Sequence, residues 1–397
     1  NVVIPNGGIK MVVADGAGAG AAVTDVLDMT GGTGNIGLGS GSLGTALTTG
    51  TDNVAIGEAA LDAVTSGADN TAVGDNAAGA TTTGGNNVAV GSAALLVNTT
   101  GADNVAVGVG ALDANTTASN NVAVGSGALS ANSTGTSNTA VGKDAGLAVS
   151  TGQNVTILGY TAGDALTTAN NVTALGSLAL STATTVSGST AVGYKAGNAA
   201  TTATDLTALG YRAGQAVTTG AANTLVGSDA GVATTTGINN VAVGAYSLTA
   251  NTTGEDNISI GTGTMIANTT GSYNTAVGSD ALDANTTASS NTAVGYAALG
   301  ANTTGTRNTA VGRGALDAIT TANDSTALGY LALSADTGGS NTAIGSYAMD
   351  STTTGTSNVA VGYNVMEANT TGATNTSVGA GSMAANTTGG SNTAVGK

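Results

Sequence analysis

The sequence has no cysteine, histidine, tryptophan or phenylalanine, and it has a single proline, Pro5. Without histidine or cysteine, the chain cannot build a Ser-His-Asp or Cys-His catalytic arrangement, and without cysteine it has no disulfides. Only seven basic residues face 23 acidic ones, so no basic stripe is available to bind nucleic acid. No run of 18 apolar residues occurs, which argues against insertion into a membrane. We therefore expect a non-enzymatic protein without cofactor, nucleic-acid partner or membrane span.

Small residues take the place of the missing large ones. Gly contributes 64 of the 397 residues, and only 8% of the chain is charged. An ordinary globular core needs large side chains, whereas this chain offers mainly Ala, Val and Leu. Because 41% of the residues are hydrophobic and strictly spaced, disorder is a poor alternative. The composition predicts apolar burial in a thin, regular layer.

A short motif, Asn-(Thr/Val)-Ala-Val-Gly, recurs along the chain and defines a tandem repeat. Its glycines recur every 17 residues from Gly57 to Gly329, with one step of 18 before that run and one of 16 after it. The 22 copies occupy residues 35–397. Residues 1–34 do not repeat. Because solenoids need capped ends, we expect 1–34 to be an N-terminal cap or junction segment and 35–397 to be a solenoid of 22 coils.

The consensus unit N-T-A-V-G-x-x-A-L-x-A-N-T-T-G-x-x predicts two short strands and two turns per coil. Helix is disfavoured by the frequent Thr, Asn and Gly. The expected fold is an all-β, parallel β-solenoid with equivalent residues about 4.8 Å apart. The leading asparagines should form a hydrogen-bonded ladder. In mid-chain coils glycine replaces the leucine, and there we expect a closer approach of neighbouring backbones: Gly146, Gly163, Gly197, Gly214 and Gly231.

A single roll of such coils has a small interior, while ordering each residue costs about 1.5 kcal/mol. Burying an Ala-rich face against identical copies would offset part of that cost. We therefore expect the chain to associate with itself, most plausibly as a homotrimer about the axis of a rod.

The units N-T-A-V-G, A-L or A-G, and A-N-T-T-G resemble the haemagglutinin-like head repeats of trimeric autotransporter adhesins, and they are similar to repeats of bacteriophage tail fibres. The resemblance covers residues 35–397. It implies a left-handed parallel β-roll that assembles as a trimer and works in attachment. Two departures stand out. Adhesin head repeats are usually shorter, and the sequence has no coiled-coil stalk, membrane anchor or chaperone domain.

Tyrosines offer the best candidate for ligand contact. Six of the nine follow the motif glycine directly, so they should line one edge of the rod near Lys195, Arg212 and Arg313: Tyr160, Tyr194, Tyr211, Tyr296, Tyr330 and Tyr363. An aromatic edge with a few polar neighbours suits a glycan or protein receptor on a cell surface. The alternative is that the rings merely cover a turn between coils.

Other polar groups recur with the repeat. Acids that lie five residues after the motif glycine, such as Asp113 and Asp283, are typical of a solvated edge rather than of a glycosidase pair. Turn oxygens in Thr51–Asn53 and Gly101–Asn104 are better explained by turn capping than by calcium, so no metal site is expected. N-T-T and N-S-T sequons, as at Asn98 and Asn132, are better explained as turn asparagines than as glycosylated ones.

Together these features predict a structural and adhesive fibre shaft, extracellular, on a virion tail or a cell surface. The alternative is a self-assembling extracellular filament in which solenoids stack end to end. Ice binding is disfavoured, because the paired threonines are adjacent in sequence and cannot both face one flat surface.

Overall fold

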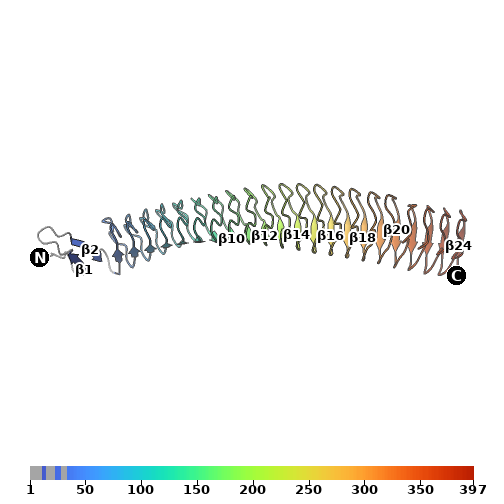
Figure 1. Ribbon diagram of the computed structural model, residues 1–397, viewed down its shortest axis with the longest axis horizontal. Coiled ribbons are helices and arrows are strands. Elements are labelled where there is room, and N and C mark those ends of the chain that lie inside the picture. The colour runs from blue at the N-terminus through green and yellow to red at the C-terminus, as the bar shows by residue number, and fades with distance from the viewer. Residues whose placement is uncertain (1–10, 15–22, 28–33) are drawn as a thin grey trace. The chain divides into compact units, whose positions relative to one another are not determined.

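The computed structural model describes residues 11–14, 23–27 and 34–397. Residues 34–397 form an all-β parallel β-solenoid of about 21 turns with about 17 residues per turn. The predicted fold class is therefore confirmed. The chain divides into two compact units, Asn1–Ser189 and Thr190–Lys397. Within each unit the coils follow one another in chain order (Figure 1).

The first unit begins with two antiparallel strands, β1 (Met11–Ala14) and β2 (Val23–Leu27). They belong to the segment expected to be a cap or junction; the rest of that segment, residues 1–10, 15–22 and 28–33, lies outside the described residues. The solenoid strands of this unit are β3 (Ile36–Leu38), β4 (Val54–Ile56), β5 (Thr71–Val73), β6 (Val88–Val90), β7 (Val105–Val107), β8 (Val122–Val124), β9 (Thr139–Val141), β10 (Thr156–Leu158) and β11 (Thr173–Leu175).

The second unit continues the same pattern. Its strands are β12 (Thr190–Val192), β13 (Thr207–Leu209), β14 (Thr224–Val226), β15 (Val241–Val243), β16 (Ile258–Ile260), β17 (Thr275–Val277), β18 (Thr292–Val294), β19 (Thr309–Val311), β20 (Thr326–Leu328), β21 (Thr342–Ile344), β22 (Val359–Val361), β23 (Thr376–Val378) and β24 (Thr393–Val395).

Strands of successive coils pair in parallel and in register, so each repeat position forms a column. Ala89 of β6, for example, pairs with Ala106 of β7. The two irregular steps preserve this register, because Ile36 pairs with Val54 and Thr326 pairs with Thr342. The turns therefore absorb the extra and the missing residue. At the motif glycine the columns are too close for a side chain: a Cβ on Gly74 would lie 2.6 Å from the carbonyl carbon of Gly91.

The core of each coil is made of small residues. The central strand alanine points inward and is fully buried, as at Ala89, and so are Ala94 and Leu95 in the leucine segment of the same coil. The flanking strand residues, Val88 and Val90, point outward and are half-buried. This corrects the expectation that an Ala-rich face is free to pack against other copies. The alanine face is already used inside the coil, and the outer strand face carries Val, Thr, Leu and Ile.

The second predicted strand is absent, because each described coil has one regular strand. In the leucine segment, residues with positive φ angles alternate with residues of ordinary conformation. In one coil Ala93 and Leu95 have positive φ angles of 56° and 55°. Left-handed leucine is uncommon and strained. It is held there because its neighbours fix both sides of the backbone: the Ala93 amide bonds to the Asp75 carbonyl of the preceding coil, and the Leu95 amide bonds to the Ala111 carbonyl of the following one.

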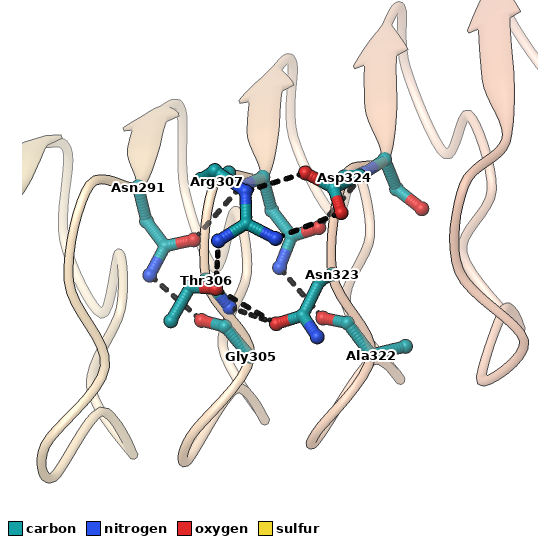
Figure 2. Close-up of polar contacts among 9 residues, drawn as sticks. Asn291, Gly305, Thr306, Arg307, Ala322, Asn323 and Asp324 are labelled. Carbon is teal, nitrogen blue, oxygen red and sulfur yellow. Dashed lines mark hydrogen bonds and ion pairs between the residues drawn. The ribbon is translucent and has the colours of Figure 1, made fainter.

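The predicted asparagine ladder is confirmed. Asn104 donates from Nδ2 to the carbonyl of Ala118 in its own coil (2.9 Å) and to Oδ1 of Asn87 (3.1 Å), and its Oδ1 accepts the backbone amide of Asn121 (3.0 Å). Each amide thus spans its coil and joins it to its neighbours. In the second unit Asn291 makes the same bond across its coil, to the carbonyl of Gly305 at 2.9 Å (Figure 2).

A second column of buried asparagines, not predicted as a ladder, lies near the first at the Asn-Thr-Thr turn. Asn98 donates to the carbonyl of Gly101 (3.0 Å), and Asn115 donates to Oδ1 of Asn98 (3.0 Å). The following threonines add an outer column, in which the Thr99 hydroxyl donates to the Thr116 carbonyl (3.0 Å). Two buried polar columns and one alanine–leucine layer therefore stabilise the typical coil.

Some coils are filled differently. In the first unit Val155 and Val172 replace the leading asparagine, Val149 and Leu166 replace the turn asparagine, and Ile157 replaces the central strand alanine.

The glycines in the leucine slot belong to this second filling. A Cβ on Gly146 would lie 2.9 Å from Cδ1 of Ile157, and one on Gly163 would lie 2.8 Å from Cδ1 of Leu166. Larger neighbouring side chains occupy the space that the missing leucine leaves. The expected closer approach of neighbouring backbones is therefore wrong for these coils: larger side chains nearby supply the volume that the leucine supplies elsewhere.

Candidate ligand-facing edge

The candidate tyrosines lie where a strand ends and the motif glycine turns the chain outward. All six are exposed, from 37% at Tyr330 to 58% at Tyr363. They lie in columns because the backbone there is joined from coil to coil: the Leu331 amide bonds to the Arg313 carbonyl, and the Gly314 amide bonds to the Tyr296 carbonyl. Side chains at equivalent positions on adjacent coils are therefore brought within contact distance of each other.

Tyr160 is the candidate tyrosine of the first unit. The ammonium group of Lys143, one coil earlier, lies 5.8 Å from the centre of its ring, a cation–π distance. Lys143 also pairs with its neighbour Asp144, with Nζ and Oδ2 3.3 Å apart. This site therefore has one aromatic ring and a cation that is already neutralised.

The second unit contains what we call the Tyr211 cluster: Tyr194, Lys195, Tyr211, Arg212 and Asp229. The two tyrosine rings stack with centroids 5.7 Å apart and an interplanar angle of 15°. Lys195 and Arg212 lie over Tyr194 and Tyr211 at 5.5 and 5.2 Å. Arg212 Nε is 2.7 Å from Oδ1 of the nearly buried Asp229, and this hydrogen bond raises the pKa of Arg212 further above its usual value.

The same unit contains a larger group, the Arg313 cluster: Tyr296, Arg313, Tyr330, Tyr347 and Tyr363. The guanidinium carbon of Arg313 lies 5.7 Å from the Tyr296 ring and 5.8 Å from the Tyr330 ring. Tyr330 meets Tyr347 edge to face at 5.2 Å, and Tyr347 meets Tyr363 edge to face at 6.3 Å. Four rings and one cation thus form a continuous strip over neighbouring coils.

Within the second unit, the five candidate tyrosines belong to two separate clusters. The predicted neighbours Lys195, Arg212 and Arg313 do lie beside them. Sequence reasoning missed Tyr347, which stands two residues after its motif glycine instead of one. Tyr347 nevertheless lies one coil after Tyr330 and one coil before Tyr363, and this near-repeat spacing of 17 and then 16 residues could have revealed it. Sequence reasoning also missed Asp229 as the partner of Arg212.

Burial affects the ionisation of several groups along the coils. It raises the pKa of Tyr347, with Tyr330 and Tyr363 adding to the effect, so this hydroxyl stays protonated at neutral pH. Desolvation likewise raises the pKa of repeat-edge acids: Asp113, Asp164, Asp283, Asp317 and Asp350. These acids are partly covered rather than fully solvated, which modifies the expectation of a solvated edge.

The turn asparagines that were weighed as calcium ligands or sugar acceptors point inward. Asn53 and Asn104 are fully buried members of the first ladder, and the sequon residues Asn98 and Asn132 are fully buried in the second. Attachment of a glycan to these side chains requires local unfolding. In the described part of the chain, no group of three or more acidic side chains is placed to hold a metal ion.

Comparison with known proteins gives no relative: no family model matches the chain, and no curated protein or solved structure is significantly similar to it. Among the residues that the structure describes, no helix is long and apolar enough to cross a membrane. The functional argument therefore depends on the coil geometry and on the two tyrosine clusters.

Proposed function

We propose that the chain is the structural and adhesive shaft of an extracellular fibre, displayed on a virion or a cell surface, in which the coils supply reach and the exposed tyrosines supply contact. The observation that carries the proposal is the in-register stacking of coils that differ little from one another, as from Ala89 of β6 to Ala106 of β7. Such a stack extends along one direction as coils are added. Its outer surface is formed by turns, on which aromatic side chains are repeatedly exposed.

Self-association is part of the proposal, through the outer face of the strands. This face presents one row of Val, Leu and Ile side chains at the third strand position and a second row, mainly of threonine, at the first. Ile258 and Ile260 of β16 are 40% and 38% exposed, and Leu328 of β20 is 47% exposed. Monomeric proteins rarely expose contiguous apolar patches larger than a few hundred Å². Packing this face against the same face of other copies would cover it, and three copies about one axis would do so symmetrically.

The direct test is the mass and symmetry of the purified protein. Analytical ultracentrifugation should give three times the chain mass of 36.9 kDa, and electron microscopy should show rods of defined length with threefold cross-section. Charged substitutions on the outer strand face, Val107→Lys with Val124→Lys, should shift the protein toward single chains while the circular dichroism of the coils is retained. A monomer at micromolar concentration would contradict the self-association. Open-ended polymers would favour the filament over the shaft.

A further inference from the structure

The Arg313 cluster differs from the other arginine sites of the chain in its charge balance. The sequence has three arginines, and two of them are neutralised by aspartate. Arg212 pairs with Asp229. Arg307 donates two hydrogen bonds to Asp324, from Nε to Oδ1 at 2.6 Å and from Nη2 to Oδ2 at 2.9 Å (Figure 2). It also donates to the Thr306 hydroxyl. Arg313 is exposed and forms no ion pair within the described ranges.

An unneutralised arginine is notable in a chain with a formal net charge of −16. The two tyrosine rings limit the positions of the guanidinium while leaving its N–H donors available, because a cation–π contact uses the face of the ring rather than a hydrogen-bond acceptor. A planar guanidinium held in this way matches a carboxylate, which it can bind through two parallel hydrogen bonds. Among the flanking groups, Tyr347 is a neutral phenol at neutral pH; the nearest acid that acts on it is Asp350, one of the causes of its raised pKa.

The rings around Arg313 indicate what carries the carboxylate. Tyrosine rings present flat apolar faces and one hydroxyl each, which suits a ligand with an apolar C–H face and polar edges. A pyranose ring has both. From Tyr296 to Tyr363 the cluster spans four coil steps, roughly 19 Å at the usual strand spacing. This length exceeds a single sugar and fits an oligosaccharide lying along the stack.

We propose that the Arg313 cluster binds an oligosaccharide with carboxylated sugars, uronate or sialate, with the carboxylate on Arg313 and neighbouring sugar rings on Tyr330, Tyr347 and Tyr363. This inference rests on the proposed adhesive function and gives it a ligand class. The Tyr211 cluster is the internal comparison: it has stacked tyrosines and an arginine, but Asp229 already occupies that arginine. Its other cation, Lys195, is a point charge without the two-donor geometry that matches a carboxylate. It should therefore have little preference for an acidic ligand.

The test is calorimetric titration of the intact chain with a galacturonate tetramer and with a sialic acid tetramer, each compared with a neutral galactose tetramer. We expect at least one acidic tetramer to bind, and the stronger of the two identifies the sugar. Arg313→Gln should weaken that binding roughly 10- to 100-fold, the loss typical of a charge-assisted hydrogen-bonded pair. Arg212→Gln is the matched control and should leave the affinity unchanged. Arg313→Lys, which keeps the charge but loses the two-point geometry, should recover only part of it.

Circular dichroism and melting of each variant confirm that the coils are intact. Equal binding of neutral and acidic tetramers, an unchanged affinity in Arg313→Gln, or no binding of either acidic tetramer would each overturn the inference. The outcome is separable from that of the proposed function, because rods and threefold mass are measured without any ligand. Trimeric rods that do not bind the acidic tetramers would support the proposed shaft function and overturn the proposed ligand class.

Discussion

Two neighbouring regions of the first unit build the same coil from different interiors. In coils led by Asn104 and Asn121, two columns of asparagine amides bond around a leucine in the left-handed slot. Further along the same unit, Val155 and Val172 end the first amide column, Val149 and Leu166 end the second, glycine takes the slot at Gly146 and Gly163, and Ile157 fills the centre. The strands nevertheless pair in register in both regions. The outline of the coil is therefore set by the backbone bonds between coils, and the interior needs only side chains of matching volume.

The largest effect is expected from Ile157→Ala, which tests whether Ile157 supplies the core volume that leucine supplies in the other coils. Ile157 fills the space beside both Gly146 and Gly163, so its loss should leave a cavity costing about 2–5 kcal/mol. Urea unfolding, together with hydrogen exchange of the surrounding amides, would measure the loss. Ala140→Gly, at the same strand position one coil earlier, is the control for a change of backbone propensity. A loss no larger than in that control would mean that Ile157 is not the volume that replaces leucine.

A double substitution tests the exchange of volume itself. Gly146 already has a φ of 61°, and leucine adopts this left-handed conformation at the same slot in Leu129, with a φ of 50°. Ile157→Ala combined with Gly146→Leu should therefore recover a substantial part of the lost stability, giving a coupling energy on the order of 1–2 kcal/mol. If the two costs simply add in a double-mutant cycle, the two interiors are not interchangeable.

The polar interior is probed by Asn104→Ala. The change leaves the backbone amide of Asn121 without its acceptor, and burying an unpaired amide costs roughly 1–3 kcal/mol. Hydrogen exchange at the Asn121 amide should become faster as well. Asn86→Gly is the matched control, because this asparagine bonds to Asp103 on the outside of the coil and glycine keeps its φ of 58° without strain, so the change in stability should be less than about 0.5 kcal/mol. Similar effects from both variants would contradict a structural role for the ladder.

The smallest effect on stability is expected at Asp336, which occupies the position of a turn asparagine in the second column. Asp336 is fully buried, accepts the amide of Gly338 at 2.9 Å and lies 3.2 Å from Nδ2 of Asn341; desolvation raises its pKa. A carboxyl with a raised folded-state pKa loses stability as pH rises through that pKa. Asp336→Asn should therefore raise the melting temperature at pH 7, with the gain shrinking as pH falls toward 4.

Asp324 provides the opposite sign for the same measurement. Its hydrogen bonds with Arg307 lower its pKa, so its contribution is present above the usual carboxyl pKa and is lost as pH falls. Melting curves of Asp336→Asn and Asp324→Asn between pH 4 and 8 should therefore diverge from the wild type in opposite directions at neutral pH. Parallel curves would show that burial does not control the ionisation of Asp336.

The repeat made most of the fold predictable, because a fixed period specifies both register and direction of pairing. The ladder at Asn87 to Asn138 followed from that period alone. The second strand was wrong because the apolar segment around Ala94 and Leu95 was assigned an extended backbone, whereas Ala93 and Leu95 have positive φ angles. The left-handed slot had a visible signal in Gly146, Gly163, Gly197, Gly214 and Gly231, since glycine favours positive φ.

The candidate site was less accessible to sequence reasoning. The period places tyrosines in columns but does not specify rotamers, so the stacking of Tyr194 on Tyr211 and the pairing of Arg212 with Asp229 could not be foreseen. The contrast between Arg212 and Arg313 depends on which aspartate lies one coil away. That is a matter of side-chain geometry that the repeat pattern alone does not encode.

The direction of the hydrogen bonds between coils has a mechanical consequence. Bonds such as that from the Val88 amide to the Asn104 carbonyl run from one coil to the next, so tension along the stack pulls them apart lengthwise rather than shearing them. Coils should therefore peel away singly, each releasing 17 residues, or roughly 60 Å of extended chain. In a force–extension experiment this predicts a train of small, evenly spaced steps. A tether of this kind would dissipate a sudden load while remaining attached.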